Sequence, residues 1–242
     1  MLTLRMLQRG FTLVELMIAS VISLLALSAI VTVYAATARH ATGELSRADL
    51  RQQLYTITEL MASDIRRSGY RAFDPLVKSS ADNPFQQAEN RLRSGAVDGE
   101  AEASCLLFSY DLDRDGLVGK GQCRENECAA GTDDDNVEQF GYRLNRGRLQ
   151  VRYGGTEMTC SSGNWQTVTT PGLVVEELNF ALYSNCLNLA EQQAPCSPEQ
   201  PALLQHAVEF SVEASLVQDR EITLRLSRWI DVRNAELRGQ AE

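Results

Sequence analysis

This chain of 242 residues has few histidines and fewer basic than acidic residues. The two histidines are His40 and His206, and neither has an evident nucleophilic partner in the sequence. Basic residues number 23 against 32 acidic ones, which gives a net charge of -9. A protein that follows nucleic-acid phosphates needs clustered Lys and Arg. We therefore expect neither an enzyme nor a nucleic-acid-binding protein.

Cysteine is absent from the first hundred residues, although six follow: Cys105, Cys123, Cys128, Cys160, Cys186 and Cys196. Zinc sites favour paired Cys-x2-4-Cys or Cys/His clusters, and here His206 is far in sequence from the one close pair. Disulfides are the better interpretation, in an oxidising compartment such as the periplasm or cell surface. Their connectivity stays open, although Cys123 with Cys128 and Cys186 with Cys196 would close short loops.

Proline is also absent until Pro75, and a long apolar run lies before it. Residues 11–38 contain no proline or glycine and one charge, Glu15. A bilayer core of ~30 Å needs about 20 apolar residues in a helix, more than the apolar part of a cleaved signal peptide supplies. Arg5 and Arg9 precede the run, so the first residues are expected in the cytoplasm and the rest outside. A simple signal anchor predicts the same topology.

Glu15 distinguishes a plain anchor from an assembly helix. A carboxylate inside an apolar span costs about 2.5 to 3.5 kcal/mol on insertion scales, and an anchor alone does not need it. Cleavage of the Gly10–Phe11 bond would create a new amino group four residues before Glu15. The hypothesis is that Glu15 of one subunit meets the amino terminus of Phe11 on a neighbour, which neutralises both charges and sets the axial register.

The segment RGFTLVELMIA, from Arg9 to Ala19, resembles the type IV prepilin cleavage and methylation signal. The resemblance implies that a prepilin peptidase cuts after Gly10 and methylates the amino group of Phe11. It assigns the conserved glutamate of the family to Glu15. Residues 1–10 are then the leader peptide and residues 11–38 the transmembrane and assembly helix.

A second stretch of helix is predicted after the apolar run. Apolar residues recur at helical spacing along one stripe, namely Leu50, Leu54, Ile57, Met61 and Ile65. No proline interrupts residues 11–71, and Gly69 with Pro75 marks a stop, so one helix of roughly 58 residues and ~87 Å is expected. Gly43 is its weakest point. We assign residues 39–71 to an amphipathic stem that packs on a head of residues 72–242.

The head is predicted to be β-rich. Residues 72–103 are rich in polar residues and are expected to form a long connecting loop. Seven β-prone runs follow: 106–110, 137–144, 148–153, 166–170, 174–184, 206–217 and 221–230. Tight turns are expected at Asn145-Arg146-Gly147 and at Gln218-Asp219-Arg220. The expected fold class is α+β, with an antiparallel sheet packed on the stem helix and stabilised by disulfides, and the resemblance identifies this as the type IV pilin fold.

Four further segments resemble the PilW-like branch of minor pilins, at residues 59–71, 108–116, 138–144 and 228–234. The type II secretion pseudopilin GspJ shares the general plan and remains an alternative. The resemblance implies a structural subunit of a pilus tip or priming complex, with other minor and major pilins, the prepilin peptidase and an inner-membrane assembly platform as partners. It implies an inner-membrane single pass with a periplasmic head, then an extracellular pilus.

One metal site is expected in the head. Asp111, Asp113 and Asp115 with Gly116 form D-x-D-x-D-G, the opening of an oxygen-rich calcium loop. The carbonyl of Leu117 is a further candidate ligand, but the position of the bidentate Glu of an EF-hand is not acidic, so the loop is not an EF-hand. Additional ligands are expected from Glu125, Glu127 or residues 133–135. A solvated acidic turn is the alternative, and a calcium-dependent tip adhesin is the function that calcium would suit.

Overall fold

The computed structural model describes residues 12–72, 83–114, 116–119, 122–124, 127–129, 137–155, 157–191, 194–197 and 200–238. The chain divides into two compact units, Met1–Ala48 and Asp49–Glu242. The boundary between the units falls inside a single helix, so each unit is described separately below.

Helix α1 runs from Leu13 to Arg67 and contains 55 residues. It ends where the sequence predicts, because Gly69 adopts a left-handed conformation with φ of 72° that other residues rarely adopt. The amide of Gly69 then donates to the carbonyl of Ser109, which turns the chain away from the helix axis. The prediction of one long uninterrupted helix is confirmed.

In the first unit, α1 exposes apolar side chains on every face. Leu24 is 66% exposed and Val33 is 66% exposed, and an 18-residue window of the helix reaches a mean hydropathy of 2.5. Its hydroxyl groups bond back to the helix itself: Ser28 Oγ donates to the carbonyl of Leu25 at 2.8 Å. Because a hydrocarbon layer offers no other hydrogen-bond partner, these internal bonds suit a membrane-spanning helix.

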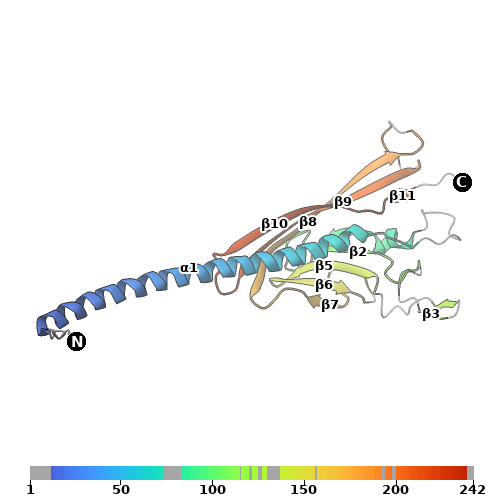
Figure 1. Ribbon diagram of the computed structural model, residues 1–242. Coiled ribbons are helices and arrows are strands. Elements are labelled where there is room, and N and C mark those ends of the chain that lie inside the picture. The colour runs from blue at the N-terminus through green and yellow to red at the C-terminus, as the bar shows by residue number, and fades with distance from the viewer. Residues whose placement is uncertain are drawn as a thin grey trace, which may run out of the picture. The chain divides into compact units, whose positions relative to one another are not determined.

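In the second unit, α1 buries the predicted apolar stripe. Leu54, Met61 and Ile65 are fully buried, and they pack in one core with side chains from two β-sheets. Figure 1 shows this part of α1 lying between β8–β10 on one side and β5–β7 on the other. Each fully buried aliphatic side chain stabilises the fold by about 1.5 to 3 kcal/mol, so the stripe is a main source of head stability.

Two antiparallel sheets form most of the head. The first has the order β1-β2-β5-β6-β7, and in the second β9 pairs with β8 on one side and with β10 and β11 on the other. The first sheet consists of β1 Arg93–Gly95, β2 Cys105–Ser109, β5 Gln139–Asn145, β6 Arg148–Tyr153 and β7 Trp165–Thr167. The second consists of β8 Leu173–Asn188, β9 Ala202–Leu216, β10 Thr223–Asp231 and β11 Glu236–Arg238. A small pair, β3 Gln122–Arg124 and β4 Glu127–Ala129, stands apart.

Both predicted tight turns join adjacent strands. Arg146 and Gly147 have φ of 51° and 71° between β5 and β6, which is the conformation that a two-residue hairpin turn requires. Between β9 and β10 the amide of Ile222 donates to the carbonyl of Asp219. Turn residues therefore fix the register of these hairpins.

The head differs from the expectation in one segment. The described end of the 72–103 segment is not a plain loop, because it contains the 3-10 turns η2 Pro84–Gln86 and η3 Ala88–Asn90 and strand β1. Buried Phe85 anchors it, and Ser109 Oγ donates to the Phe85 carbonyl. The expected antiparallel β-sheet packed on the stem helix is confirmed, and its larger strands divide into two sheets that each place an apolar face against the core.

Two disulfides are present among the described side chains. Cys105 bonds to Cys160 across 55 residues of sequence, and Cys186 bonds to Cys196 across 10 residues. The second is one of the short loops that the sequence suggests. Cys123 and Cys128 are opposite each other in the β3–β4 pair, but their side chains lie outside the described structure.

Candidate functional site

The start of α1 places Glu15 in a specific local arrangement. Thr12 precedes the helix, and its Oγ1 and backbone N donate to Glu15 Oε2 at 3.0 and 3.1 Å. In return the amide of Glu15 lies 3.3 Å from Thr12 Oγ1. These reciprocal bonds form a capping box, in which each side chain satisfies a backbone donor of the first turn.

The sequence carried a signal for this cap that our interpretation of Glu15 did not use. Thr-x-x-Glu directly before an apolar helix is the pattern of a capping box. Glu15 is exposed, so the cap leaves the carboxylate open to a cation. Gly10 and Phe11 lie outside the described residues, and the predicted cleavage and pairing stay predictions.

An acidic cluster lies in the loop after β2. One carboxylate oxygen from each of Asp111, Asp113 and Glu138 lies within 4.8 Å of the others. Asp111 and Glu138 are buried, whereas Asp113 is exposed. The structure thus brings Asp111 and Asp113 together as the sequence predicts, and adds Glu138.

Backbone amides surround the two buried carboxylates. Asp111 Oδ1 accepts from the amide of Arg114 at 2.6 Å, and its Oδ2 accepts from Ala72 and Gly116 at 2.8 and 3.0 Å. Glu138 Oε1 accepts from the amide of Leu112 at 2.7 Å. These bonds shape the loop. Asp111 Oδ2 uses both of its lone pairs on amides, whereas Asp111 Oδ1 and the two oxygens of Glu138 each keep one for another ligand.

Burial raises the pKa of Glu138 to about 7, and the neighbouring Asp113 and Asp111 carboxylates act in the same direction. The amides of Gly119 and Leu112 oppose this, because they favour the charged form. A carboxyl group whose pKa is raised in the folded chain stabilises the fold below its unfolded value, and that contribution is lost as the pH rises through about 7. Deprotonation therefore leaves clustered negative charge that a cation would offset.

The remaining predicted ligands are mostly outside the described side chains. Leu117 lies in the same loop with its side chain 41% exposed. Asp115, Glu125 and residues 133–135 lie outside the described residues, and of Glu127 only the backbone, in β4, is described. Sequence reasoning missed Glu138 because it lies far along the chain and becomes a neighbour only through pairing of β2 with β5.

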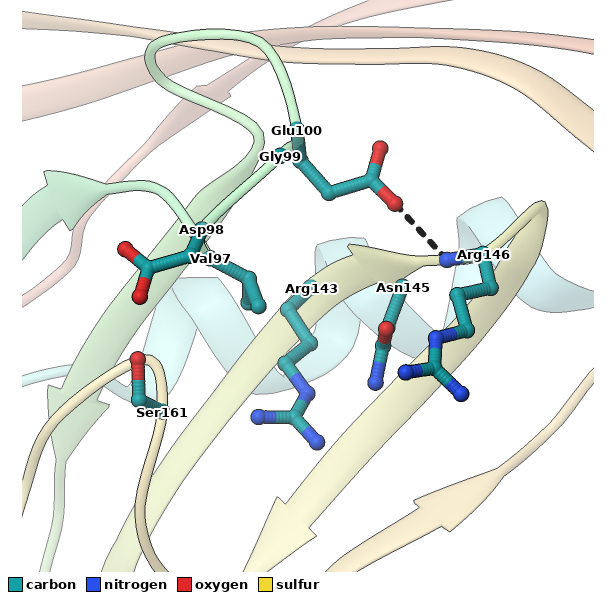
Figure 2. A pocket seen from close by; sticks show the side chains of 8 residues that line it. All are labelled: Val97, Asp98, Gly99, Glu100, Arg143, Asn145, Arg146 and Ser161. Atoms are coloured by element: carbon teal, nitrogen blue, oxygen red, sulfur yellow. Dashed lines mark hydrogen bonds between the residues drawn. The ribbon is translucent and has the colours of Figure 1, made fainter.

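A hollow lies beside the β5–β6 turn, and Figure 2 shows its lining side chains. It measures about 600 Å³ and is lined by Val97, Asp98, Gly99, Glu100, Arg143, Asn145, Arg146 and Ser161. The guanidinium of Arg143 lies 4.2 Å from the ring centre of Trp165 and donates to Gln150. None of the lining residues is a histidine or a cysteine.

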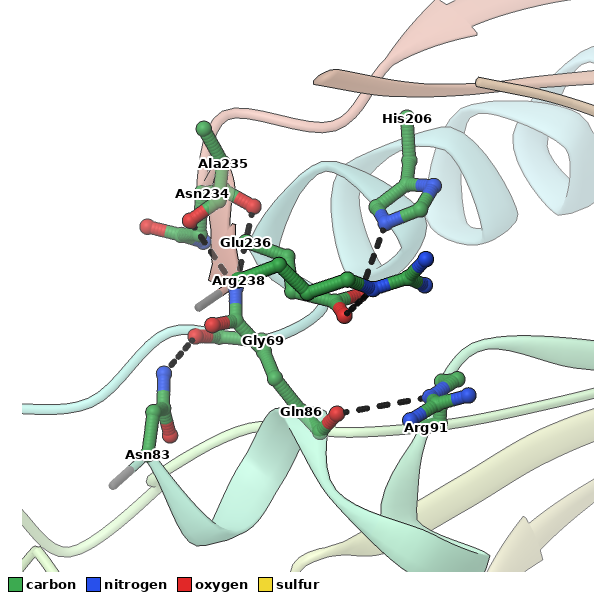
Figure 3. A network of polar contacts seen from close by, with 9 residues as sticks. All are labelled: Gly69, Asn83, Gln86, Arg91, His206, Asn234, Ala235, Glu236 and Arg238. Carbon is green, nitrogen blue, oxygen red and sulfur yellow. Dashed lines mark hydrogen bonds and ion pairs between the residues drawn. The ribbon is translucent and has the colours of Figure 1, made fainter. Parts of the chain in front are cut away.

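His206 takes part in a structural network, drawn in Figure 3. Its Nε2 lies 3.1 Å from Glu236 Oε2, and this contact is the main reason that the pKa of Glu236 is lowered. Gln86 donates to the carbonyls of Asn234 and Ala235, at 3.2 Å each. The network joins η2 to the last strand, which gives His206 a positioning role in the fold.

Comparison with known proteins agrees with the long helix and its amino-terminal sequence. The family model for prepilin peptidase-dependent protein B matches residues 43–232. A model for the prokaryotic N-terminal methylation motif matches residues 5–31. The chain belongs to the prepilin peptidase-dependent protein B family.

This prepilin peptidase-dependent protein B family member is thus a processed pilin-like protein with an α+β pilin-like fold. An uncharacterized protein of Haemophilus influenzae is 26% identical over 137 residues, which cover 51% of this chain and 57% of that relative. The alignment therefore spans little more than half of the relative's length. No solved structure matches the chain.

Proposed function

We propose that this chain is a minor type IV pilin of the PilW-like branch, a structural subunit of the tip or priming complex of the pilus and not an enzyme. The observation that carries the proposal is a 55-residue helix whose apolar first part holds one acidic residue, Glu15, directly inside the methylation motif. An anchor needs the apolar length but not the charge.

The proposed sequence of events follows from this helix. A prepilin peptidase cuts after Gly10 and methylates Phe11, and the subunit waits in the inner membrane with its head in the periplasm. An assembly platform then transfers the helix into a fibre of minor and major pilins. In the fibre, Glu15 exchanges part of its cap on Thr12 for the amino terminus of a neighbouring subunit, which is a charged and therefore stronger partner.

Mass spectrometry of the mature amino terminus tests the processing step. In cells that contain the prepilin peptidase we expect a chain that starts at methylated Phe11. The matched control replaces Gly10 with Val, which should leave the leader in place while the head still folds. A wild-type chain that keeps its first ten residues in fibre-producing cells would contradict the proposal.

A pair of substitutions tests the assembly step. Glu15→Gln should abolish incorporation into fibres, since it removes the charge while the side chain keeps its size. Glu44→Gln is the control, because Glu44 is an exposed residue of the same helix that pairs with Arg47 at 3.1 Å.

A rescue experiment distinguishes a pilin from a GspJ-like pseudopilin. Rescue of a pilus mutant, but not of a type II secretion mutant, favours the pilin. Rescue of the secretion mutant alone favours the pseudopilin.

We also propose that the acidic cluster binds Ca²⁺. The support is that the oxygens of Asp111, Asp113 and Glu138 lie close enough to share one ion whose ligands sit about 2.3 to 2.6 Å away. Calcium would neutralise Glu138 at pH above its raised pKa and fix the loop after β2. Hydrogen bonds to Asp111 and Glu138 also order this loop without an ion, so the proposal needs a direct test.

The calcium test compares melting curves of the full chain with calcium and with a chelator. We expect a higher midpoint with calcium, and no such difference in an Asp113→Asn variant. Asp113 is the suitable position because it is exposed and its replacement leaves the two buried carboxylates intact. Asp98→Asn, outside the cluster, is the control. Identical wild-type curves under both conditions would show that the loop is a solvated acidic turn.

A further inference from the structure

Four arginines gather in one hollow at the carboxyl end of α1, in a chain whose net charge is -9. The hollow measures about 410 Å³ and is lined by Arg66, Arg67, Tyr70, Tyr110, Asp111, Leu112, Arg114, Arg233 and Asn234. These residues come from the last turn of α1, the loop after β2 and the segment after β10. Positive charge is therefore concentrated locally on an acidic protein.

Hydrogen bonds to backbone carbonyls hold the three walls of this arginine hollow together. The amide of Arg233 donates to the carbonyl of Arg66 at 3.1 Å, and Asn234 Nδ2 donates to the Ser68 carbonyl at 3.0 Å. The amide of Asp111 donates to the carbonyl of Tyr70 at 2.9 Å. These hydrogen bonds place the hollow within the second unit, with Arg66 and Arg67 on the last turn of α1 and with Arg114 and Arg233 on the two segments that are bonded to it.

The arginines differ in how their charge is used. Arg67 pairs with Asp64 at 2.5 Å and lies 4.6 Å from the ring centre of Tyr110. Within the described part of the chain, no carboxylate forms an ion pair with the side chains of Arg66, Arg114 or Arg233. Asp111 also lines the hollow, but its carboxylate accepts from backbone amides and forms no ion pair with these arginines. Among the described residues, these three guanidinium groups therefore have no carboxylate partner and can meet an anion.

We infer that this hollow binds an acidic segment of a partner polypeptide through its carboxylates. Arginine suits carboxylates because its planar donor pair forms two parallel hydrogen bonds. Tyr70, Tyr110 and Leu112 supply apolar wall between the charges, which accommodates the aliphatic stems of Asp or Glu side chains. A free phosphate would use the arginines but not this apolar wall, and a long polyanion would be repelled by the acidic remainder of the chain.

Binding of a hexa-aspartate peptide to the full chain in neutral detergent micelles tests this inference. Calorimetry at low salt should detect the peptide, and at 1 M salt the signal should be lost, because exposed charges are then screened within about 3 Å. The triple variant Arg66→Gln, Arg114→Gln, Arg233→Gln should bind about tenfold more weakly, as expected when a few partly exposed ion pairs are removed. Its unfolding midpoint shows whether the head stays folded.

Two companion variants make the outcome specific. The control Arg39→Gln, Arg51→Gln, Arg146→Gln removes the same charge from outside the hollow and should bind like wild type. Replacement of Arg66, Arg114 and Arg233 by Lys keeps the charge but loses the paired donors, and should restore part of the affinity. If the control weakens binding as much as the hollow variant, only net charge matters and the inference fails.

Other results would also overturn it. The inference fails if the wild-type chain does not bind the peptide. It also fails if the chain binds inorganic phosphate but not the peptide. Peptide binding that is seen only after Asp133, Asp134 and Asp135 are changed to Asn would mean that the chain's own acidic run occupies the arginines. None of these measurements requires processing or a pilus, so their failure is distinguishable from failure of the proposed function.

Discussion

The two parts of α1 use apolar side chains in opposite ways. In the first unit Leu24, Ile30 and Val33 are all more than half exposed, on every face of the helix. In the second unit Leu54, Met61 and Ile65 occupy one buried stripe, with charged residues on the other faces. Continuous apolar surface requires lipid or neighbouring helices, whereas a stripe requires a core in its own chain. The difference separates a segment whose apolar surface lies outside any core of its own chain from a segment that builds such a core.

The largest expected effect comes from removing one apolar side chain from each part. Met61→Ala should destabilise the head by about 3 kcal/mol, because the fully buried side chain leaves a cavity between the sheets. Leu24→Ala, its counterpart in the exposed part, should leave head stability unchanged. Urea unfolding of both variants in micelles, followed by the fluorescence of Trp165 and Trp229, measures the difference. Equal losses would show that the two parts do not differ as described.

The second prediction concerns the carboxylates of the two parts. Asp64 is buried and accepts from the hydroxyl of Tyr142 at 2.6 Å, whereas Glu15 is exposed. Tyr142→Phe removes the donor and leaves a buried carboxylate oxygen short of a partner, at a cost of about 2 kcal/mol. Glu15→Gln should not change head stability at all. The same urea measurement tests both variants. If Tyr142→Phe does not change the free energy of unfolding, water replaces the lost hydroxyl.

A smaller effect is expected at the start of the helix. Thr12→Val removes the capping hydroxyl and should cost the first turn about 1 kcal/mol, since its amides lose their side-chain acceptor. Hydrogen exchange of residues 13–16 should then be about fivefold faster. Thr32→Val is the control, because that hydroxyl only bonds back to the carbonyl of Ala29 inside the helix. Unchanged exchange at the first turn would show that Glu15 does not depend on Thr12.

The features predictable from sequence are those that depend on near neighbours along the chain. The stripe from Leu50 to Ile65 repeats at helical spacing. Gly69 marks the helix end because glycine, without a Cβ, readily adopts the left-handed backbone conformation found there. Arg146 and Gly147 likewise fix the β5–β6 turn, so the predicted bounds of β6 match the observed ones. Local pattern and turn chemistry carried these predictions.

The features that sequence did not predict depend on contacts between distant segments. Cys105 meets Cys160 only because the first sheet brings the end of β1–β2 near the segment before β7. Glu138 joins Asp111 only through the pairing of β2 with β5. The arginine hollow combines three segments that lie far apart in sequence. No period or spacing in the chain encodes such juxtapositions.

The smallest predicted effect tests the junction between the two parts of α1. Gly43 lies in the helix, and a Cβ added there would meet nothing within 4 Å. Gly43→Ala should therefore stabilise the helix locally by about 0.5 to 1 kcal/mol, because alanine loses less backbone entropy than glycine.

Hydrogen exchange of residues 40–48 should slow by about two- to fivefold in Gly43→Ala, which follows from that free-energy gain. The contrast is Gly69→Ala, where φ is +72° and the new Cβ would lie 2.7 Å from Gln86 Nε2, so the head should lose stability. If Gly43→Ala slows exchange and also reduces incorporation into fibres, bending at this glycine is needed for assembly. If exchange does not slow, α1 is not a continuous helix at Gly43 in solution. The exposed apolar part and the buried stripe would then belong to two separate helices.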